Sequence, residues 1–186
     1  MRVYTPRELR RFLAAVDRAL KRPAEVVVIG GAAAALEYGV VSGTRDIDTW
    51  TRVHEDLAAA AERARQTTCL AVPFSRSRVA DGPCDFELRL ERTLPRLRRL
   101  KVMVPEKHDL VLMKILRGDE HDLQAIEAIH RRSPLELAVL VKRYREEMSA
   151  AIIDPGRLRG QFLAMVERLF PEQVAEAEKQ VGARKR

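Results

Sequence analysis

Apolar and polar residues alternate along the chain in patterns that predict helices throughout and strands only in the first hundred residues or so. In the segment from Thr5 to Leu20, apolar residues recur every three or four positions, which is typical of an amphipathic helix. Thr5, Pro6 and Glu8 have the order of a capping box with proline at the first helical position. The same reasoning predicts further helices at 32–38, 54–66, 105–117, 120–130, 134–148, 155–169 and 171–180.

Short β-branched or alternating segments predict the strands, which are expected at 25–29, 46–51, 69–72, 84–90 and 100–104. The first of these is apolar enough to be buried on both faces, whereas Asp46–Thr51 and Cys84–Leu90 alternate as half-exposed strands do. The fold class is therefore α+β. We expect a small mixed sheet in an α/β core over residues 1–104 and a helical subdomain over residues 105–186.

The composition is that of a soluble globular protein, with 46% hydrophobic and 33% charged residues. No apolar run approaches the roughly 20 residues of a membrane span, and the N-terminus opens into a charged helix rather than a signal peptide. We therefore expect no membrane partner and a cytoplasmic location. Thirty-four Lys and Arg against 27 Asp and Glu give a formal charge of +7, which favours polyanionic partners such as nucleotides or nucleic acids.

Cysteine and histidine give no sign of a metal centre or a disulfide framework. Cys69 and Cys84 lack a CxxC spacing and are expected to be small buried residues. The histidines have no recognisable ligand spacing and are expected at the surface or at helix caps, at positions 54, 108, 121 and 130.

Two aspartates on one predicted strand are candidates for a metal site. Asp46 and Asp48 are two residues apart, so both carboxylates project to one face while Ile47 points to the other and packs. Neighbouring carboxylates repel each other unless a cation lies between them, and Mg²⁺ prefers oxygen ligands together with substrate phosphates. The alternative is a pair of surface acids at the start of a strand.

Gly30 and Gly31 lie between a predicted strand and a predicted helix. Backbone N–H groups at such a turn can receive a phosphate, and the absence of a side chain permits close approach. A tight turn without a ligand is the alternative. The order of strand, glycine pair, helix and Asp-x-Asp strand predicts that the glycines and the aspartates meet at the same edge of one sheet.

The segments Ile29–Ala34 (IGGAAA) and Thr44–Asp48 (TRDID) resemble the signature of the polymerase-beta-type nucleotidyltransferase superfamily, and more narrowly its branch of AbiE-type toxins and minimal nucleotidyltransferases. The resemblance implies a nucleoside triphosphate held by Gly30, Gly31, Thr44 and Arg45. It also implies two Mg²⁺ ions on Asp46, Asp48 and a third carboxylate.

The resemblance continues downstream and covers roughly Val26 to Ile129. In Cys84–Glu87 (CDFE), Asp85 matches the third carboxylate, with Glu87 in reserve on the same face of the predicted strand. Lys114 and Asp122 match a closing motif that neutralises phosphate charge and orients the lysine or acts on the acceptor hydroxyl. The alternatives are solvated acids at the first place and a salt bridge between adjacent helices at the second.

Two positions depart from the family pattern. A repeated Asp is replaced by Ala125, and a basic residue expected between Lys114 and Asp122 is replaced by Asp119 or Glu120. These departures concern the nucleotide preference and the rate.

The resemblance therefore implies an Mg²⁺-dependent enzyme that moves a nucleotidyl group from an NTP to a hydroxyl of RNA, such as tRNA, or of a protein. It also implies a place in a toxin–antitoxin or phage-defence system with a cognate partner protein. The basic stretch Arg89–Lys101 suits an RNA backbone. One alternative is a non-catalytic antitoxin or regulator of the same fold. Another is a plain nucleic-acid-binding module.

Overall fold

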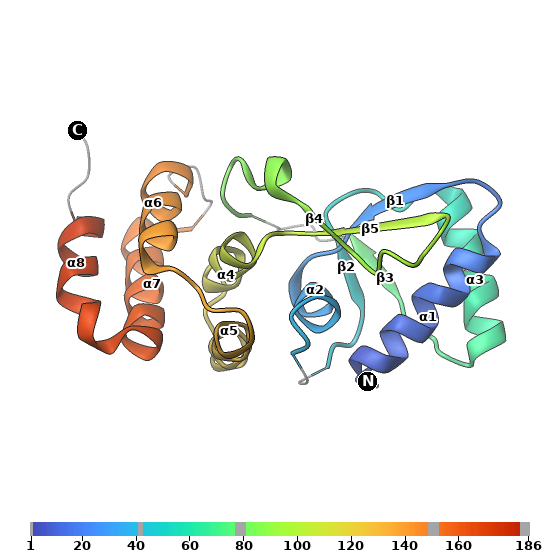
Figure 1. The fold of residues 1–186 in the computed structure, drawn as a ribbon, viewed down its shortest axis with the longest axis horizontal. Coiled ribbons are helices and arrows are strands. Elements are labelled where there is room, and N and C mark those ends of the chain that lie inside the picture. The colour runs from blue at the N-terminus through green and yellow to red at the C-terminus, as the bar shows by residue number, and fades with distance from the viewer. Residues whose placement is uncertain (1, 41–42, 77–80, 149–152, 183–186) are drawn as a thin grey trace. The chain divides into compact units, whose positions relative to one another are not determined.

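The computed structural model describes residues 2–40, 43–76, 81–148 and 153–182. The chain forms two compact units, of which the first comprises residues 1–79 with 90–105 and the second comprises residues 80–89 with 106–186. The class is α+β, as the sequence predicts, because small mixed sheets lie among helices and the C-terminal part is helical (Figure 1).

The helices of the first unit are α1 (Pro6–Ala19), α2 (Gly30–Leu36) and α3 (Glu55–Thr68), close to their predicted bounds. The predicted capping box is confirmed, since the Thr5 side chain accepts from the amide of Glu8 and the Glu8 side chain accepts from the amide of Thr5. The apolar face of α1 is buried, and α1 packs along α3 (Figure 1). The amphipathic pattern of the sequence therefore correctly predicts which face of α1 is buried.

The strands of the first unit form two small sheets. Strands β1 (Ala24–Val27), β5 (Leu100–Val104) and β4 (Glu91–Thr93) form one sheet in the order β1-β5-β4, with β1 parallel and β4 antiparallel to β5. Strands β2 (Ile47–Thr49) and β3 (Phe74–Arg76) pair in parallel in the other. An antiparallel bridge between Val28 and Thr49 joins the end of β1 to β2. This bridge brings the segments that hold the glycine pair and the aspartates together.

The predicted strand at Cys69–Val72 is wrong. Cys69 instead ends α3 in a left-handed conformation with φ of 55°, and β3 begins only at Phe74. Leu70 and Val72 are buried, so their alternation reflects packing of an irregular segment rather than a paired strand.

The predicted strand at Cys84–Leu90 is also wrong. Its residues form a turn followed by a 3₁₀ helix at Phe86–Arg89 (η1), and the nearest strand, β4, begins at Glu91. Phe86 is buried while its neighbours on both sides are exposed, a pattern that a strand and a short 3₁₀ turn share over so few residues.

The second unit contains the five C-terminal helices, each near its predicted place. They are α4 (Lys107–Ile115), α5 (Glu120–Arg132), α6 (Leu137–Glu147), α7 (Pro155–Leu169) and α8 (Val174–Gly182), the last preceded by a 3₁₀ turn at Pro171–Gln173 (η2). Asp119 and Asp154 cap α5 and α7 through their side chains, and Gly118 has a left-handed φ of 62° just before α5. Caps and proline starts explain why these helices are readable from the sequence.

Two expectations about individual side chains are wrong. Cys69 and Cys84 are both exposed rather than buried. His108 is only 3% exposed, because its ring fills a place among the helices of the second unit, where Nδ1 contacts Glu106 at 2.7 Å and Nε2 accepts from the amide of Glu136 at 2.9 Å. Its partners come from two separate segments, which a search for ligand spacing does not detect.

Candidate active site

The glycine pair stands where β1 leaves the core. Val26, Val27, Val28 and Ile29 are all buried, and Gly30 then turns the chain with a φ of 65°, a conformation that residues with a Cβ rarely adopt. Ile29 occupies the N-cap position of α2 and provides no side-chain cap. The first backbone N–H groups of α2 are therefore not capped by the side chain of the N-cap residue.

The two aspartates flank a buried residue, as their spacing predicts. Ile47 and Thr49 are fully buried, whereas Asp46 and Asp48 are partly exposed on the opposite face. The carbonyl of Asp48 accepts from the amide of Ile29 at 2.9 Å, so the main chain of β2 is fixed directly beside the residue that precedes Gly30.

The side chains of this segment lie against the glycine pair. A Cβ on Gly30 would stand 3.2 Å from Oδ2 of Asp48, and a Cβ on Gly31 would stand 3.2 Å from Oγ1 of Thr44. The Thr44 hydroxyl donates to the carbonyl of Asp46 at 3.1 Å. The structure thus brings Gly30, Gly31 and Thr44 together with the Asp46–Asp48 segment, and any side chain on either glycine would crowd it.

The chemistry of this group suits a phosphate and a hard cation. Two carboxylates on one strand face supply oxygen ligands, and small residues leave backbone amides approachable from the same place. Arg45, between Thr44 and Asp46, is exposed and adds a positive charge. These residues suit Mg²⁺ better than a soft metal ion, because their donor atoms are oxygens.

Lys114 and Asp122 form a buried ion pair in the second unit. Lys114 is 6% and Asp122 1% exposed, and Nζ of Lys114 donates to Oδ1 of Asp122 at 3.0 Å, joining α4 to α5. Burial raises the pKa of Asp122, but hydrogen bonds from Arg117 and the charge of Lys114 outweigh it and leave that pKa below its usual value. The pair is therefore an ionised, desolvated contact rather than a surface salt bridge.

Sequence reasoning missed Arg117. Its Nε and Nη2 donate to the two carboxylate oxygens of Asp122 at 2.6 and 2.8 Å. Arg117 lies between Lys114 and Asp122 in the sequence, two residues before Asp119, so this interval does contain a basic residue. Its position between Lys114 and Asp122 is the feature of the sequence from which its role could be predicted.

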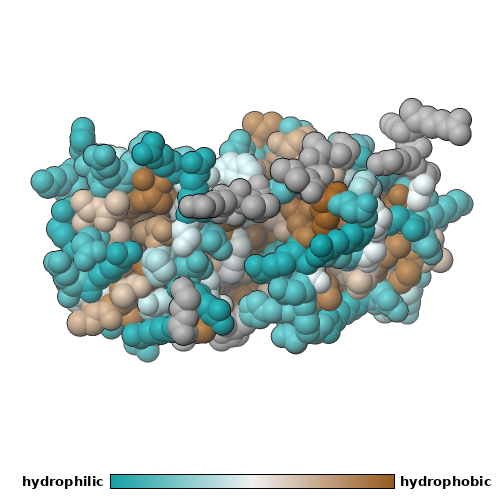
Figure 2. Space-filling view, turned by 180° about the vertical axis from the view of Figure 1, so that it is seen from behind, coloured by the Kyte–Doolittle hydropathy of each residue, from teal (hydrophilic) through white to brown (hydrophobic). Residues whose placement is uncertain are grey.

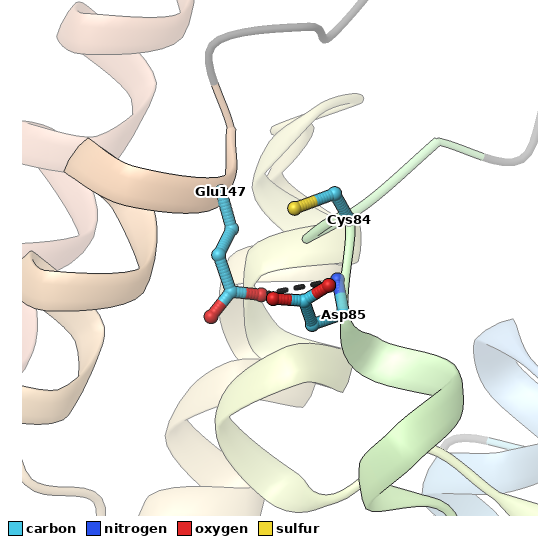
Figure 3. Close-up of side chains that lie close together, drawn as sticks. All are labelled: Cys84, Asp85 and Glu147. Atoms are coloured by element: carbon cyan, nitrogen blue, oxygen red, sulfur yellow. Dashed lines mark hydrogen bonds between the residues drawn. The ribbon is translucent and has the colours of Figure 1, made fainter.

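Asp85 lies in the second unit, in the turn before η1. Its backbone N–H donates to Oε2 of Glu147 at 3.3 Å, and Cys84, Asp85 and Glu147 offer ligand atoms within 4.8 Å of one another (Figure 3). Loss of part of the water around the sulfur and the nearby acids Asp85 and Glu147 raise the pKa of the exposed Cys84 thiol, which keeps it protonated. Because the strand at 84–90 is not formed, the same-face relation predicted for Asp85 and Glu87 no longer follows.

An ion network, also missed, holds this segment within the second unit. Arg89 at the end of η1 donates to both oxygens of the fully buried Asp109, at 2.8 and 2.9 Å, and to Glu147 at 2.6 Å. Arg143 contacts Asp109 at 2.9 Å and also pairs with Glu106. Three separate segments, η1, α4 and α6, meet in this network, and no single stretch of sequence contains its pattern.

The network predicts acid sensitivity of the second unit. Burial raises the pKa of Glu106, but hydrogen bonds from His108 and Arg143 outweigh it and lower that pKa from 4.5 to about 2. The ionised Glu106 carboxylate stabilises the folded state by on the order of 3 kcal/mol at a pH above its pKa in the unfolded chain, which is about 4.5. This stabilisation is lost as the pH falls from about 4.5 through 2. Urea unfolding between pH 6 and 2.5 should therefore show a steeper loss of stability for the wild type than for Glu106→Gln. Equal slopes would contradict the assignment.

No helix among the described residues is both long and apolar enough to span a membrane.

Comparison with known proteins gives one result. A family model described as a nucleotidyltransferase of unknown function (DUF6036) matches residues 7–167, which is most of the chain and includes both groups of residues described above. None of the curated proteins and none of the solved structures matches the chain. The glycine pair set against an Asp-x-Asp strand and the match over residues 7–167 agree, and the chain belongs to this family of nucleotidyltransferases.

Proposed function

We propose that the first unit binds an Mg²⁺–nucleoside triphosphate at the Gly30–Gly31 turn and the Asp46/Asp48 pair, and transfers its nucleotidyl group to an acceptor hydroxyl. The observation that carries this proposal is how closely the backbone of Gly30 approaches the Asp48 side chain. A Cβ atom placed on Gly30 would lie only 3.2 Å from Oδ2 of Asp48. A bare backbone at that point lets a phosphate approach the carboxylates that hold its metal.

Each residue of the group has a distinct part in the proposal. The amides after Ile29 orient the triphosphate, Thr44 shapes the turn through its bond to Asp46, and Arg45 attracts the phosphates. Asp46 and Asp48 hold Mg²⁺, which when bound supplies charge stabilisation to the entering and leaving oxygens. The acceptor oxygen then bonds to the α-phosphorus in line, its proton passes to solvent water, and the bond to pyrophosphate breaks.

The roles proposed for residues of the second unit rest on the family resemblance. Asp85 is proposed as the third carboxylate, and Lys114 with Asp122 as the pair that offsets phosphate charge. What supports these two residues is their burial as an ion pair at 3.0 Å, because charged side chains are seldom placed in an interior without a partner or a task.

Lys114→Ala is expected to lower turnover by about 10²–10³-fold, the scale of losing one preorganised contact to a developing charge. Asp122→Ala should add little to that loss, because residues that act as a unit are not additive. Single-turnover rates per folded molecule measure both effects. Arg168→Ala, which removes an exposed pair with Glu120, serves as the control. Unchanged turnover with a loss of stability in Lys114→Ala would make the pair purely structural.

The acceptor is proposed to be RNA, such as tRNA, with a protein hydroxyl as the other possibility, and the chain is proposed to act with a cognate antitoxin or toxin protein in a defence system. The AbiE-type resemblance supports this placement, and the net charge of +7 favours a polyanionic acceptor. Family membership favours the catalytic form over a non-catalytic regulator.

The experiment that tests the proposal is incubation of the purified chain with each of the four NTPs, labelled at the α-phosphate, in the presence of Mg²⁺ and either total tRNA or cell lysate. Label is expected in one class of macromolecule, with pyrophosphate released and with complete dependence on Mg²⁺. Absence of label from every acceptor with all four nucleotides would overturn the proposal.

A further inference from the structure

The positive charge of the chain resides in the first unit. Residues 1–79 and 90–105 contain eighteen Lys and Arg against ten Asp and Glu, a formal charge of +8, whereas the second unit has sixteen against seventeen. Sixteen of the eighteen basic residues of the first unit are arginines. A surplus confined to one unit differs from the even spread of an ordinary solvated surface.

Helix α1 carries part of this surplus on its exposed side. Arg7, Arg11 and Arg18 are exposed and lie four and seven residues apart, which places them on one side of the helix, away from the buried face of Leu9 and Val16. No ion pair or hydrogen bond occupies their guanidinium groups among the described residues. The three span about 16 Å along the helix axis.

A second group of arginines lies beside the C-terminal end of α1. Oδ1 of Asp17 accepts from the amides of Arg99 and Leu100, each at 2.7 Å, and Nη1 of Arg99 donates to the carbonyl of Leu20 at 2.8 Å. These bonds tie the turn between β4 and β5 to α1. The turn also displays Arg96 and Arg98, both exposed and without an ionic partner in the part of the chain that the structure describes.

The acids nearby do not neutralise these arginines. Asp17 uses its oxygen on backbone amides, which, against the opposing effect of burial, lower its pKa and keep it ionised as a structural clamp. Glu8 and Glu25 pair with Arg2 and Lys101 instead. The charge of the exposed arginines is therefore available to a partner.

The turn itself is held in a set shape. Leu94 has a φ of 51°, a conformation rare for leucine, and its carbonyl accepts from the amide of Leu97 at 3.0 Å. The carbonyl of Leu97 in turn accepts from Arg92 at 3.1 Å. A constrained turn presents Arg96 and Arg98 at a lower entropic cost on binding than a loose loop would.

We infer that Arg7, Arg11, Arg18, Arg96 and Arg98, called here the arginine surface, bind the phosphate backbone of RNA. One strand of a DNA duplex carries one phosphate per about 3.4 Å of axis, and on that scale the length of α1 from Arg7 to Arg18 corresponds to about five phosphates. Guanidinium groups bind phosphate in a fork and stack on unpaired bases, which lysine does not do. RNA also ends in a ribose with two hydroxyls, the kind of group that the proposed transfer needs.

Figure 2 draws one face of the molecule, on which hydrophilic residues predominate with hydrophobic ones between them. The choice of RNA over DNA, and the role of this RNA as the acceptor, rest on the proposed function, whereas the binding of a phosphate backbone by these arginines does not.

The test measures binding without transfer. The full chain is titrated, in EDTA and without nucleotide, into a fluorescent 20-nucleotide single-stranded RNA and into DNA of the same sequence, at 50 to 200 mM KCl. The test variant combines Arg11→Gln, Arg18→Gln, Arg96→Gln and Arg98→Gln. The matched control removes the same charge from exposed residues of the second unit through Arg131→Gln, Arg132→Gln, Lys142→Gln and Arg145→Gln.

The test variant is expected to bind RNA at least about 30-fold more weakly at 100 mM salt, with a slope of log K against log salt that is shallower by about 3. The control should stay within about threefold of the wild type, and thermal melting should show that both variants fold. Equal losses in the two variants, wild-type binding to DNA as tight as to RNA, or no RNA binding at 50 mM salt would each overturn the inference. Because nucleotide is absent, none of these results depends on whether the chain transfers label.

Discussion

Asp48→Asn is expected to reduce nucleotidyl transfer by about 10³-fold or more, because an amide cannot supply the charge that holds Mg²⁺ against a triphosphate. Asp48 is partly exposed and its neighbour Asp46 carries a like charge on the same face. The substitution should therefore leave the free energy of unfolding unchanged or slightly higher, since it relieves repulsion between the carboxylates. Single-turnover transfer and thermal melting with and without Mg²⁺–NTP measure the two effects.

Asp56→Asn provides the matched control in the same unit. Asp56 is an exposed aspartate of α3 that pairs with Arg22 at 3.0 Å. Its loss should leave transfer and the nucleotide-dependent rise in melting temperature intact, with a change in stability below about 1 kcal/mol. Transfer by Asp48→Asn at the wild-type rate would remove Asp48 from the metal site.

Asp109→Asn is expected to lower the free energy of unfolding of the second unit by about 3–5 kcal/mol. Asp109 is fully buried and receives the fork of Arg89 together with Arg143. An amide of the same shape leaves two guanidinium groups facing a neutral side chain that presents its own N–H donors. Urea unfolding followed by circular dichroism measures the loss.

Glu120→Gln makes the same chemical change in an exposed ion pair. The Glu120 side chain is 61% exposed where it contacts Arg168. Its substitution should cost no more than about 1 kcal/mol, the usual limit for surface pairs. Similar losses in Asp109→Asn and Glu120→Gln would mean that burial does not set the strength of the network.

The sequence predicts those parts of the fold that local signals specify. Thr5 and Pro6 mark the start of α1, Pro155 marks that of α7, and in each case the cap is present in the structure. The strands at 69–72 and 84–90 fail because alternation over four to seven residues is common to strands and to irregular packed segments. Only pairing with another segment distinguishes them, and pairing is not a local property.

The same distinction applies to the candidate site. That Gly30 and Asp48 lie together follows from two adjacent segments joined by the short helix α2, so their proximity could be predicted. Arg89 contacts Asp109, 20 positions away, and Glu147, 58 positions away, and the composition of the segments around these residues does not predict the contacts. Arg117 is the exception, because it lies between Lys114 and Asp122 and could have been found.

The bond from Arg89 to Asp109 bears on how the helical part can be produced as a fragment. A polypeptide that begins at Glu106 would contain α4 to α8 but would lack Arg89, and of the cations that the structure describes beside Asp109 only Arg143 would remain. Such a fragment would expose the surface that residues 81–89 cover and would leave an undercompensated charge in its interior. A synthetic peptide of residues 81–89, supplied in trans, would restore the missing guanidinium group, so the fragment and the peptide together are the pair to use for complementation.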